Sequence, residues 1–235
     1  MDRLTRKDLK SDRFAIEVQH GVEYVTDHRR QLIRWISIAA GVLVAVLAVF
    51  LYRQHQHSIR QEQLAAAFKI QNAAVGPSGN EFMQTYPNQA EKDKAVTRAL
   101  TEVVAKYPGT EEGLIAEYFL ACNAADKGNM QEAERRFKLV VDNGNASYAS
   151  LAKLALAQIY QSQGKGAEGE KLIRSLIDHP SVLVSKEEAT IALARLIAPT
   201  KPQEARKLLE PLRANERSAV SRAALTALSD ISQPK

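Results

Sequence analysis

The feature that most constrains the fold is an internal repeat with a spacing of about 36 residues. Residues 116–141 and 152–177 align at an offset of 36. The aligned positions pair small with small, glycine with glycine and large with large residues, as in Ala121 with Ala157, Gly128 with Gly164, and Phe137 with Ile173. Each copy reads as a helix, a turn and a second helix. Such units bury their apolar faces against their neighbours, so an all-α array is expected.

Further copies extend this array in both directions. A third copy begins near Glu188, and a degenerate copy with Leu100 and Val103 precedes the first pair. A last helix, at about residues 217–230, has Val220, Ala224, Leu225 and Leu228 as its apolar residues and would cap the array. A period in the mid-thirties with small residues at fixed positions is typical of tetratricopeptide repeats. A non-repetitive bundle whose leucines align by chance is the alternative, but it would not reproduce small, large and turn positions together.

An apolar run near the N-terminus predicts a membrane anchor. Residues 36–51 contain no charged side chain, and Trp35 and Tyr52 flank them as interfacial aromatics would. As a helix, residues 35–52 would span about 27 Å, close to the thickness of the bilayer hydrocarbon. A buried soluble helix rarely lacks polar residues on every face. A signal peptide would have a shorter leader and small residues after the run, so an uncleaved transmembrane helix is expected.

The flanking charges predict the orientation of this anchor. Residues 1–34 hold eight Lys and Arg, including Arg29, Arg30 and Arg34, whereas three follow the run within a similar distance. The positive-inside rule therefore favours a cytoplasmic N-terminus and a C-terminal domain outside the cytoplasm. The predicted parts are a cytoplasmic arm with a short amphipathic helix at 1–34, the transmembrane helix at 35–52, a juxtamembrane helix and turn at 53–80, and the tetratricopeptide-like solenoid at 81–235.

The sequence offers no pattern that indicates catalysis or a cofactor. The net charge of +5 is spread thinly, which argues against nucleic-acid binding. Motifs for nucleophilic, phosphate-binding or metal chemistry are not found, and His55 and His57 have no nearby carboxylate or Cys in sequence. Glu132, Glu134 and Glu168 are expected on exposed helix faces, where they are merely solvated. We therefore expect no enzyme, no cofactor and no metal site. A membrane-bound hydrolase with an unusual site is considered only for contrast, because no group of residues indicates one.

A protein-binding surface is the expected use of this fold. Stacked helix pairs form a concave face lined mainly by the first helix of each unit. The positions beside the small packing residues should point into that face, and they are Tyr118, Cys122, Leu154, Gln158, Ile191 and Arg195. This mixed, nearly uncharged face suits extended or partly unfolded polypeptide. The alternative, that several of these side chains merely pack between units, is equally open.

The order of parts resembles a known family. Tyr107-Pro108-Gly109-Thr110 leads into a repeat helix, residues 151–178 are similar to the repeat region of that family, and the arm, anchor, juxtamembrane helix and about three repeats follow one another. This arrangement resembles the inner-membrane ancillary subunit of the Sec translocon, a family linked to periplasmic chaperones. The resemblance implies a bacterial inner-membrane protein with a periplasmic repeat domain that helps pass exported polypeptides to chaperones.

The same resemblance implies the partners. They would be secretion-channel subunits, chaperones or exported polypeptides, with the lipid bilayer contacted through the anchor. The alternative is a self-assembling scaffold of the cell envelope without a chaperone role. That reading rests on the small-residue run Ala39-Ala40-Gly41, which would let anchors pack into a homo-oligomer, and on the apolar stripe of the arm.

Overall fold

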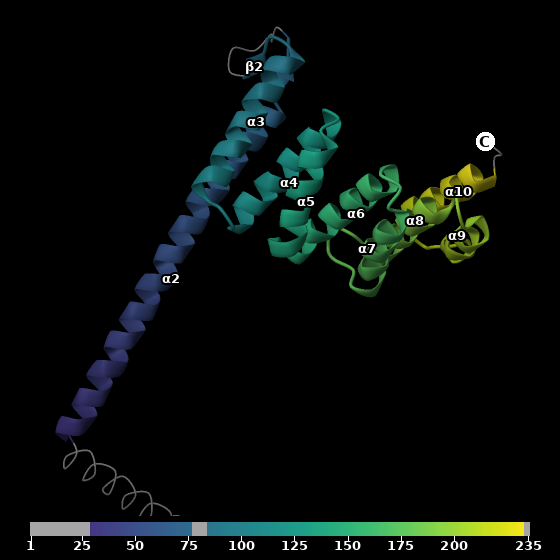
Figure 1. Ribbon diagram of the computed structural model, residues 1–235. Coiled ribbons are helices and arrows are strands. Elements are labelled where there is room, and N and C mark those ends of the chain that lie inside the picture. The colour runs from purple at the N-terminus through teal and green to yellow at the C-terminus, as the bar shows by residue number, and fades with distance from the viewer. Residues whose placement is uncertain (1–28, 77–83, 233–235) are drawn as a thin grey trace, which may run out of the picture. The chain divides into compact units, whose positions relative to one another are not determined.

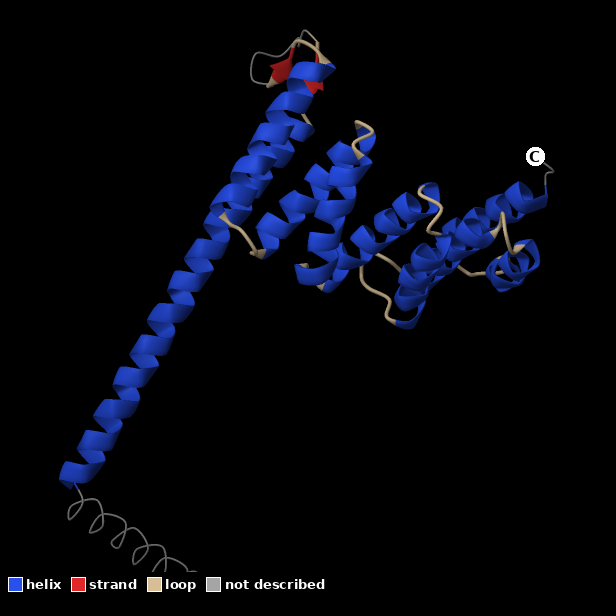
Figure 2. Ribbon diagram, viewed as in Figure 1, coloured by secondary structure: helices blue, strands red, loops and turns tan. Residues whose placement is uncertain are grey.

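The computed structural model describes residues 29–76 and 84–232, which are almost entirely helical (Figure 2). The amphipathic helix predicted for the arm lies outside the described residues. The chain divides into two compact units, Met1–Ser58 and Ile59–Lys235. Each unit is described by itself.

The first unit contains most of the long helix α2 (Arg29–Gln71), which includes the anchor predicted at 35–52. The apolar window of α2 is long enough to cross a membrane, and none of it is buried within the protein. Trp35 is 69% exposed and Phe50 is 62% exposed. The core helix of a soluble protein would instead be mostly buried. Ser37, the polar residue of the run, donates its hydroxyl hydrogen to the carbonyl of Ile33 at 2.7 Å, so its polar group is satisfied within the helix.

The second unit begins within α2 and continues as a row of helices (Figure 1). The elements after α2 are β1 (Ala74–Val75), β2 (Thr85–Tyr86), α3 (Gln89–Lys106), α4 (Glu111–Asp126), α5 (Met130–Asn143), α6 (Ala146–Ser162), α7 (Gly166–Asp178), α8 (Lys186–Ile197), α9 (Pro202–Leu209), the 3-10 turn η1 (Glu210–Leu212) and α10 (Ser218–Ser232). Each of α3 to α9 contacts the helix that follows it, and α10 packs on α8 and α9. The all-α repeat expected from the sequence is present, with α4–α5, α6–α7 and α8–α9 as its three clear units.

Local sequence signals set where these helices begin and turn. Side-chain oxygens cap the first turns of α3, α4, α5, α6 and α8, and they belong to Asn88, Thr110, Asn129, Asn145 and Ser185. Gly128 and Gly164, which align in the repeat, both have φ of 77°. Left-handed backbone favours glycine, so the same residue makes the same turn between the two helices of successive units.

Small buried residues recur at one position of each first helix and one of each second helix, and in α6 and α7 they mark a close approach of the two backbones. Each unit contributes one small residue from its first helix and one from its second, and the pairs are Ala121 with Ala133, Ala157 with Gly169, and Ala194 with Ala205. All six are buried. A Cβ atom added to Gly169 would lie 2.9 Å from the carbonyl oxygen of Ala157, so the backbones are already near contact.

The stretch after the predicted anchor contains a short pair of strands that the prediction lacked. Helix α2 ends at Gln71, and Ala74–Val75 then pairs in parallel with Thr85–Tyr86. Strands of two residues leave no readable alternation in the sequence, so this pair was missed.

The compact repeat unit begins earlier than the boundary at residue 81. Leu64 and Ala67 of α2 are 7% and 1% exposed and belong to one apolar cluster with Leu100 of α3 and Leu120 of α4. The guanidinium of Arg60 lies 3.0 Å from the carboxylate of Glu112, which is almost fully buried. The end of α2 therefore contributes to the apolar core that α3 and α4 form.

We predict that replacing Leu156 by Ala will destabilise the repeat unit by about 2–5 kcal/mol, because the side chain is 3% exposed in the centre of α6. The free energy of unfolding from urea titrations followed by circular dichroism is the measurement. Leu225, 46% exposed on α10, is the matched control. Equal losses for the two Leu→Ala variants would mean that the register of the repeat is wrong.

We also predict that a fragment starting at Ile59 will be more stable than one starting at residue 81. The shorter fragment loses the buried Leu64 side chain, and it removes Arg60 from the buried Glu112. Breaking a buried ion pair by removing one partner costs about 3–5 kcal/mol. Thermal unfolding of the two fragments provides the comparison, and indistinguishable midpoints would show that α2 is no part of the repeat core.

Candidate protein-binding groove

A groove of about 640 Å³ lies across α6, α8 and α10, with a floor that reaches α7. It is lined by Leu154, Gln158 and Gln161 from α6, Ile173 from α7, Ser185, Glu188, Ile191, Ala192, Arg195 and Leu196 from α8, and Ala219, Val220 and Ala223 from α10. The contributing helices α6 and α8 are the first helices of successive units, and α10 follows them in the same role. Four of the six residues predicted from the sequence meet here, namely Leu154, Gln158, Ile191 and Arg195.

The floor of the groove is apolar and firmly held. Ile191 is 7% exposed and belongs to the buried cluster of α7, α8, α9 and α10. Leu154 and Val220 are partly buried and pack against the same cluster from opposite sides of α8. A ligand in the groove would therefore contact apolar surface that needs little rearrangement, which lowers the entropic cost of binding.

The rim carries polar groups from two helices. Gln158 and Gln161 on α6 are exposed, and their side-chain amides can donate and accept hydrogen bonds. Glu188 and Arg195 on α8 are exposed as well. Within the described ranges neither of these two charged side chains forms an ion pair. The groove can thus offer apolar contact, amide hydrogen bonds and one charge of each sign.

The other two predicted residues, Tyr118 and Cys122, lie elsewhere. The ring of Tyr118 meets the rings of Phe119, Phe137 and Tyr148 at centroid distances of 5.4, 5.7 and 5.5 Å. These edge-on contacts join α4, α5 and α6. Tyr118 and Cys122 thus lie where side chains pack between units, and the structure does not bring them to the groove.

Burial also explains the titration of these two groups. It raises the pKa of the Tyr118 hydroxyl far above its ordinary value, and the adjacent Cys122 adds to the rise. Burial raises the pKa of the Cys122 thiol too. A thiol that stays protonated is a weak nucleophile, so its chemistry gives no reason to assign Cys122 a reactive role.

Sequence reasoning missed the contribution of α10 and the acidic rim residue. Helix α10 was expected only as a cap, and Val220 was identified as one of its apolar residues without a place in the binding face. Glu188 was identified only as the approximate start of a repeat. The signal for Glu188 was available, since it lies three residues before Ile191 and seven before Arg195 and so shares one helical face with them.

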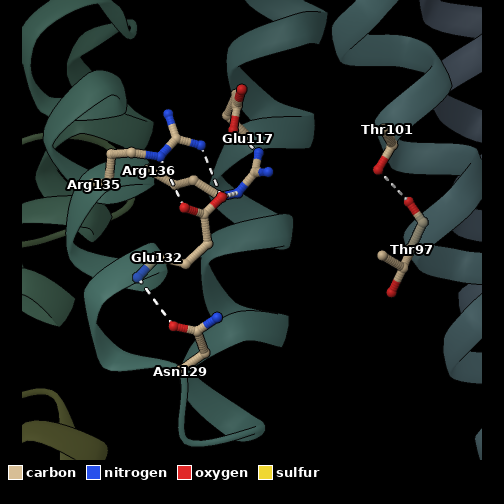
Figure 3. A network of polar contacts seen from close by, with 7 residues as sticks. All are labelled: Thr97, Thr101, Glu117, Asn129, Glu132, Arg135 and Arg136. Atoms are coloured by element: carbon tan, nitrogen blue, oxygen red, sulfur yellow. Dashed lines mark hydrogen bonds and ion pairs between the residues drawn. The ribbon is translucent and has the colours of Figure 1, made fainter.

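Outside the groove, a cluster of charged side chains joins α4 to α5 (Figure 3). Arg135 donates two hydrogen bonds of 2.8 Å to Glu132, and Arg136 lies 2.7 Å from the same carboxylate while also pairing with the buried Glu117. Glu132 and Glu134 were expected to be merely solvated. That expectation was wrong, because Glu134 also pairs with Lys138 at 2.6 Å and accepts a hydrogen bond of 2.8 Å from Gln163.

The described residues contain no group of three or more His, Cys, Asp or Glu side chains that could hold a metal ion. His55 lies on α2 within the first unit. The ion pairs described in the second unit lie within single helices, such as Glu132 with Arg135, or join different helices, such as Glu117 with Arg136.

Comparison with known proteins gives one match. A family model described as a tetratricopeptide repeat-like domain matches residues 33–181. Neither a curated protein nor a solved structure matches the chain. The match runs from the apolar part of α2 to just past α7, so it includes α6 of the groove, whereas α8 and α10 lie beyond it.

The Glu132 cluster predicts a loss of stability in acid. The hydrogen bond from Arg135 is the main cause that lowers the pKa of Glu132 to about 2, against an ordinary value of 4.5. A carboxylate with a lowered pKa stabilises the fold above its unfolded pKa, and this contribution disappears as the pH falls from about 4.5 towards 2. We expect Glu132→Gln to show a smaller drop in melting temperature between pH 5 and pH 2 than the unmodified chain. Glu168→Gln, at an exposed position of α7, should leave the drop unchanged. An identical drop in all three proteins would contradict the assignment.

Proposed function

The chain belongs to the tetratricopeptide repeat-like domain family, and on this basis we propose that it is a membrane-anchored adaptor that binds polypeptides in the groove of α6, α8 and α10. Domains of this family are protein-interaction modules. Repeat solenoids bind through extended surfaces formed by stacked units. A protein-binding role is therefore the natural use of this domain, and catalysis is not.

The observation that carries the proposal is the composition of the groove. Its floor offers Leu154, Ile191 and Val220, and its rim offers the amides of Gln158 and Gln161. These side chains are already partly or almost fully buried, so a partner gains only about 25 cal/mol per Å² of the apolar surface that is still exposed, and a few contacts give weak binding. Amide groups hydrogen-bond to the backbone of any sequence. This combination suits weak capture of many extended polypeptides better than recognition of one folded surface.

The anchor and the charge bias supply the proposed location. Helix α2 presents exposed apolar side chains over the length of a bilayer, and Arg29, Arg30 and Arg34 lie at its N-terminal end. With the positive side in the cytoplasm, the repeat unit faces the periplasm. The resemblance to the ancillary subunit of the Sec translocon supports a place beside the secretion channel, where the groove would receive exported chains and pass them to chaperones.

Site-specific photo-crosslinking in intact membranes tests this function. A photoreactive residue at Gln158, on the rim of the groove, should capture exported polypeptides or secretion-channel subunits. The same residue at Glu168, on the exposed side of α7, is the control and should capture them much less. Capture of lipid alone from Gln158 would exclude the adaptor role at this groove, and capture of a second copy of the chain would favour a self-assembling scaffold.

A topology measurement tests the location independently. We expect alkaline phosphatase fused at the C-terminus to be active, and a fluorescent protein at the same place to stay dark after export, because the charge bias places the repeat unit outside the cytoplasm. Replacing Arg29, Arg30 and Arg34 by Gln should reduce the phosphatase activity. A bright fluorescent protein with inactive phosphatase on the unmodified chain would place the repeat unit in the cytoplasm.

A further inference from the structure

We infer that the groove selects polypeptide segments that carry opposite charges at the two ends of a short apolar stretch, with Glu188 binding the cation and Arg195 binding the carboxylate. The inference rests on the proposed protein-binding function and names the chemistry of the ligand. It follows from three observations: the two charges lie on one face of α8, apolar surface lies between them, and neither side chain is in an ion pair with another described residue.

The two charges lie on one face of α8 and face the same groove. They are seven residues apart, which is close to two full turns, so they project from the same side and are separated by about 10.5 Å along the helix axis. Glu188 lies in the first turn of α8 and Arg195 in the last. The groove is therefore acidic at one end and basic at the other.

Both charges are available to a ligand. Glu188 and Arg195 are exposed and line the groove, and among the described residues neither side chain takes part in an ion pair. This distinguishes them from Glu134 and Glu170 on the second helices of two units. Glu134 pairs with Lys138, and Glu170 pairs with Arg174 and Lys201. A charged ligand at Glu188 or Arg195 therefore does not have to break an ion pair between described residues.

Apolar surface fills the distance between the two charges. Ile191 and Ala192 lie between them on α8, and Leu154 and Val220 approach from the two neighbouring helices. An extended segment advances about 3.3 Å per residue and a polyproline segment about 3.1 Å. A ligand therefore spans the distance in three to four residues, with its apolar side chains over the floor and its charged residues at the ends.

Charge complementarity decides which segments fit. A segment with one basic and one acidic end satisfies both Glu188 and Arg195 in one of its two directions along the groove. A segment with two acidic or two basic ends places a like charge against one of them in either direction. Complementary charges govern specificity more than affinity, so the uniform segments should bind more weakly by several-fold at low salt.

Three matched peptides test this selection on the full-length chain in detergent micelles. Each carries an uncharged fluorophore on its N-terminal amine through a Gly-Gly spacer and is amidated at its C-terminus. All three share a Val-Leu-Ala centre, which is flanked by Lys and Glu, by two Glu, or by two Lys. Fluorescence anisotropy at low salt should show the Lys/Glu peptide binding about fivefold tighter than the other two. This preference should fade at 0.5 M salt, at which the charges are screened within about 4 Å.

Charge variants of the groove should change the preference in a defined direction. Arg195→Glu makes both ends acidic and should prefer the peptide with two Lys, whereas Glu188→Lys should prefer the peptide with two Glu. Both residues also complement the dipole of α8, so reversing them weakens the helix. The neutral variants address this, because they should keep the unmodified melting temperature within a few degrees. Glu188→Gln should bind the Lys/Glu and two-Glu peptides equally, and Arg195→Gln should bind the Lys/Glu and two-Lys peptides equally.

The outcomes separate this inference from the proposed function. All three peptides could bind equally well and all lose their binding in the Ala219→Trp variant. That result would overturn the charge selection and leave the groove as a general polypeptide site. Ala219 is exposed on the groove wall, and Ala167→Trp, at the second residue of α7 instead of α10, is the matched control. Binding of none of the peptides would overturn both. A preference that survives Ala219→Trp would show that the charges act outside the groove.

Discussion

The distance at which two helices can pack depends on the side chains between them, and in this repeat unit those side chains are kept small. Ala157 and Gly169 illustrate the constraint, because even one added methyl group on the glycine would press on the backbone of the facing helix. With the first and second helix so close, the larger residues turn towards the neighbouring units. Phe137, Ile173 and Leu209 recur at 36-residue spacing and are at most 2% exposed. One small-residue contact per unit thus determines where the apolar core of the array lies.

Polar contacts reinforce the same spacing from outside. Glu134 and Glu170 occupy equivalent positions of successive second helices, and each reaches the inter-helix turn of the next unit. Glu134 accepts a hydrogen bond of 2.8 Å from Gln163, and Glu170 pairs with Lys201 at 2.9 Å. Exposed pairs of this kind add little energy each, but their repetition favours one register between units. The first helices α6 and α8 then lie in line with α10, and the groove follows from that alignment.

The repeat was readable from the sequence because it depends on residue size and turn chemistry at fixed spacing. The small pairs, the glycine turns and the three clear units all leave a pattern within one stretch of chain. The binding face could be predicted only in part, because whether a side chain lines it depends on which side chains of other units pack against that residue. Leu154 and Ile191 line the groove that α10 helps to form. Tyr118 instead packs against the rings of Phe137 and Tyr148. The pairing of Glu132 with Arg135 and Arg136 was missed although the spacing of three and four residues permits it, because spacing alone does not separate a paired carboxylate from a solvated one.

The most direct test of this account is the free energy of unfolding of Gly169→Leu, compared with Ala167→Leu on the same helix. Helix propensity alone predicts that leucine in place of an interior glycine stabilises α7 by about 1 kcal/mol. The close approach of Ala157 to Gly169 predicts the opposite sign, a loss of about 1–3 kcal/mol or more from overpacking, while the exposed Ala167 position changes little. Circular dichroism during urea unfolding measures both. A Gly169→Leu protein that is as stable as the unmodified chain, or more stable, would contradict the claim that close contact between small residues organises the repeat.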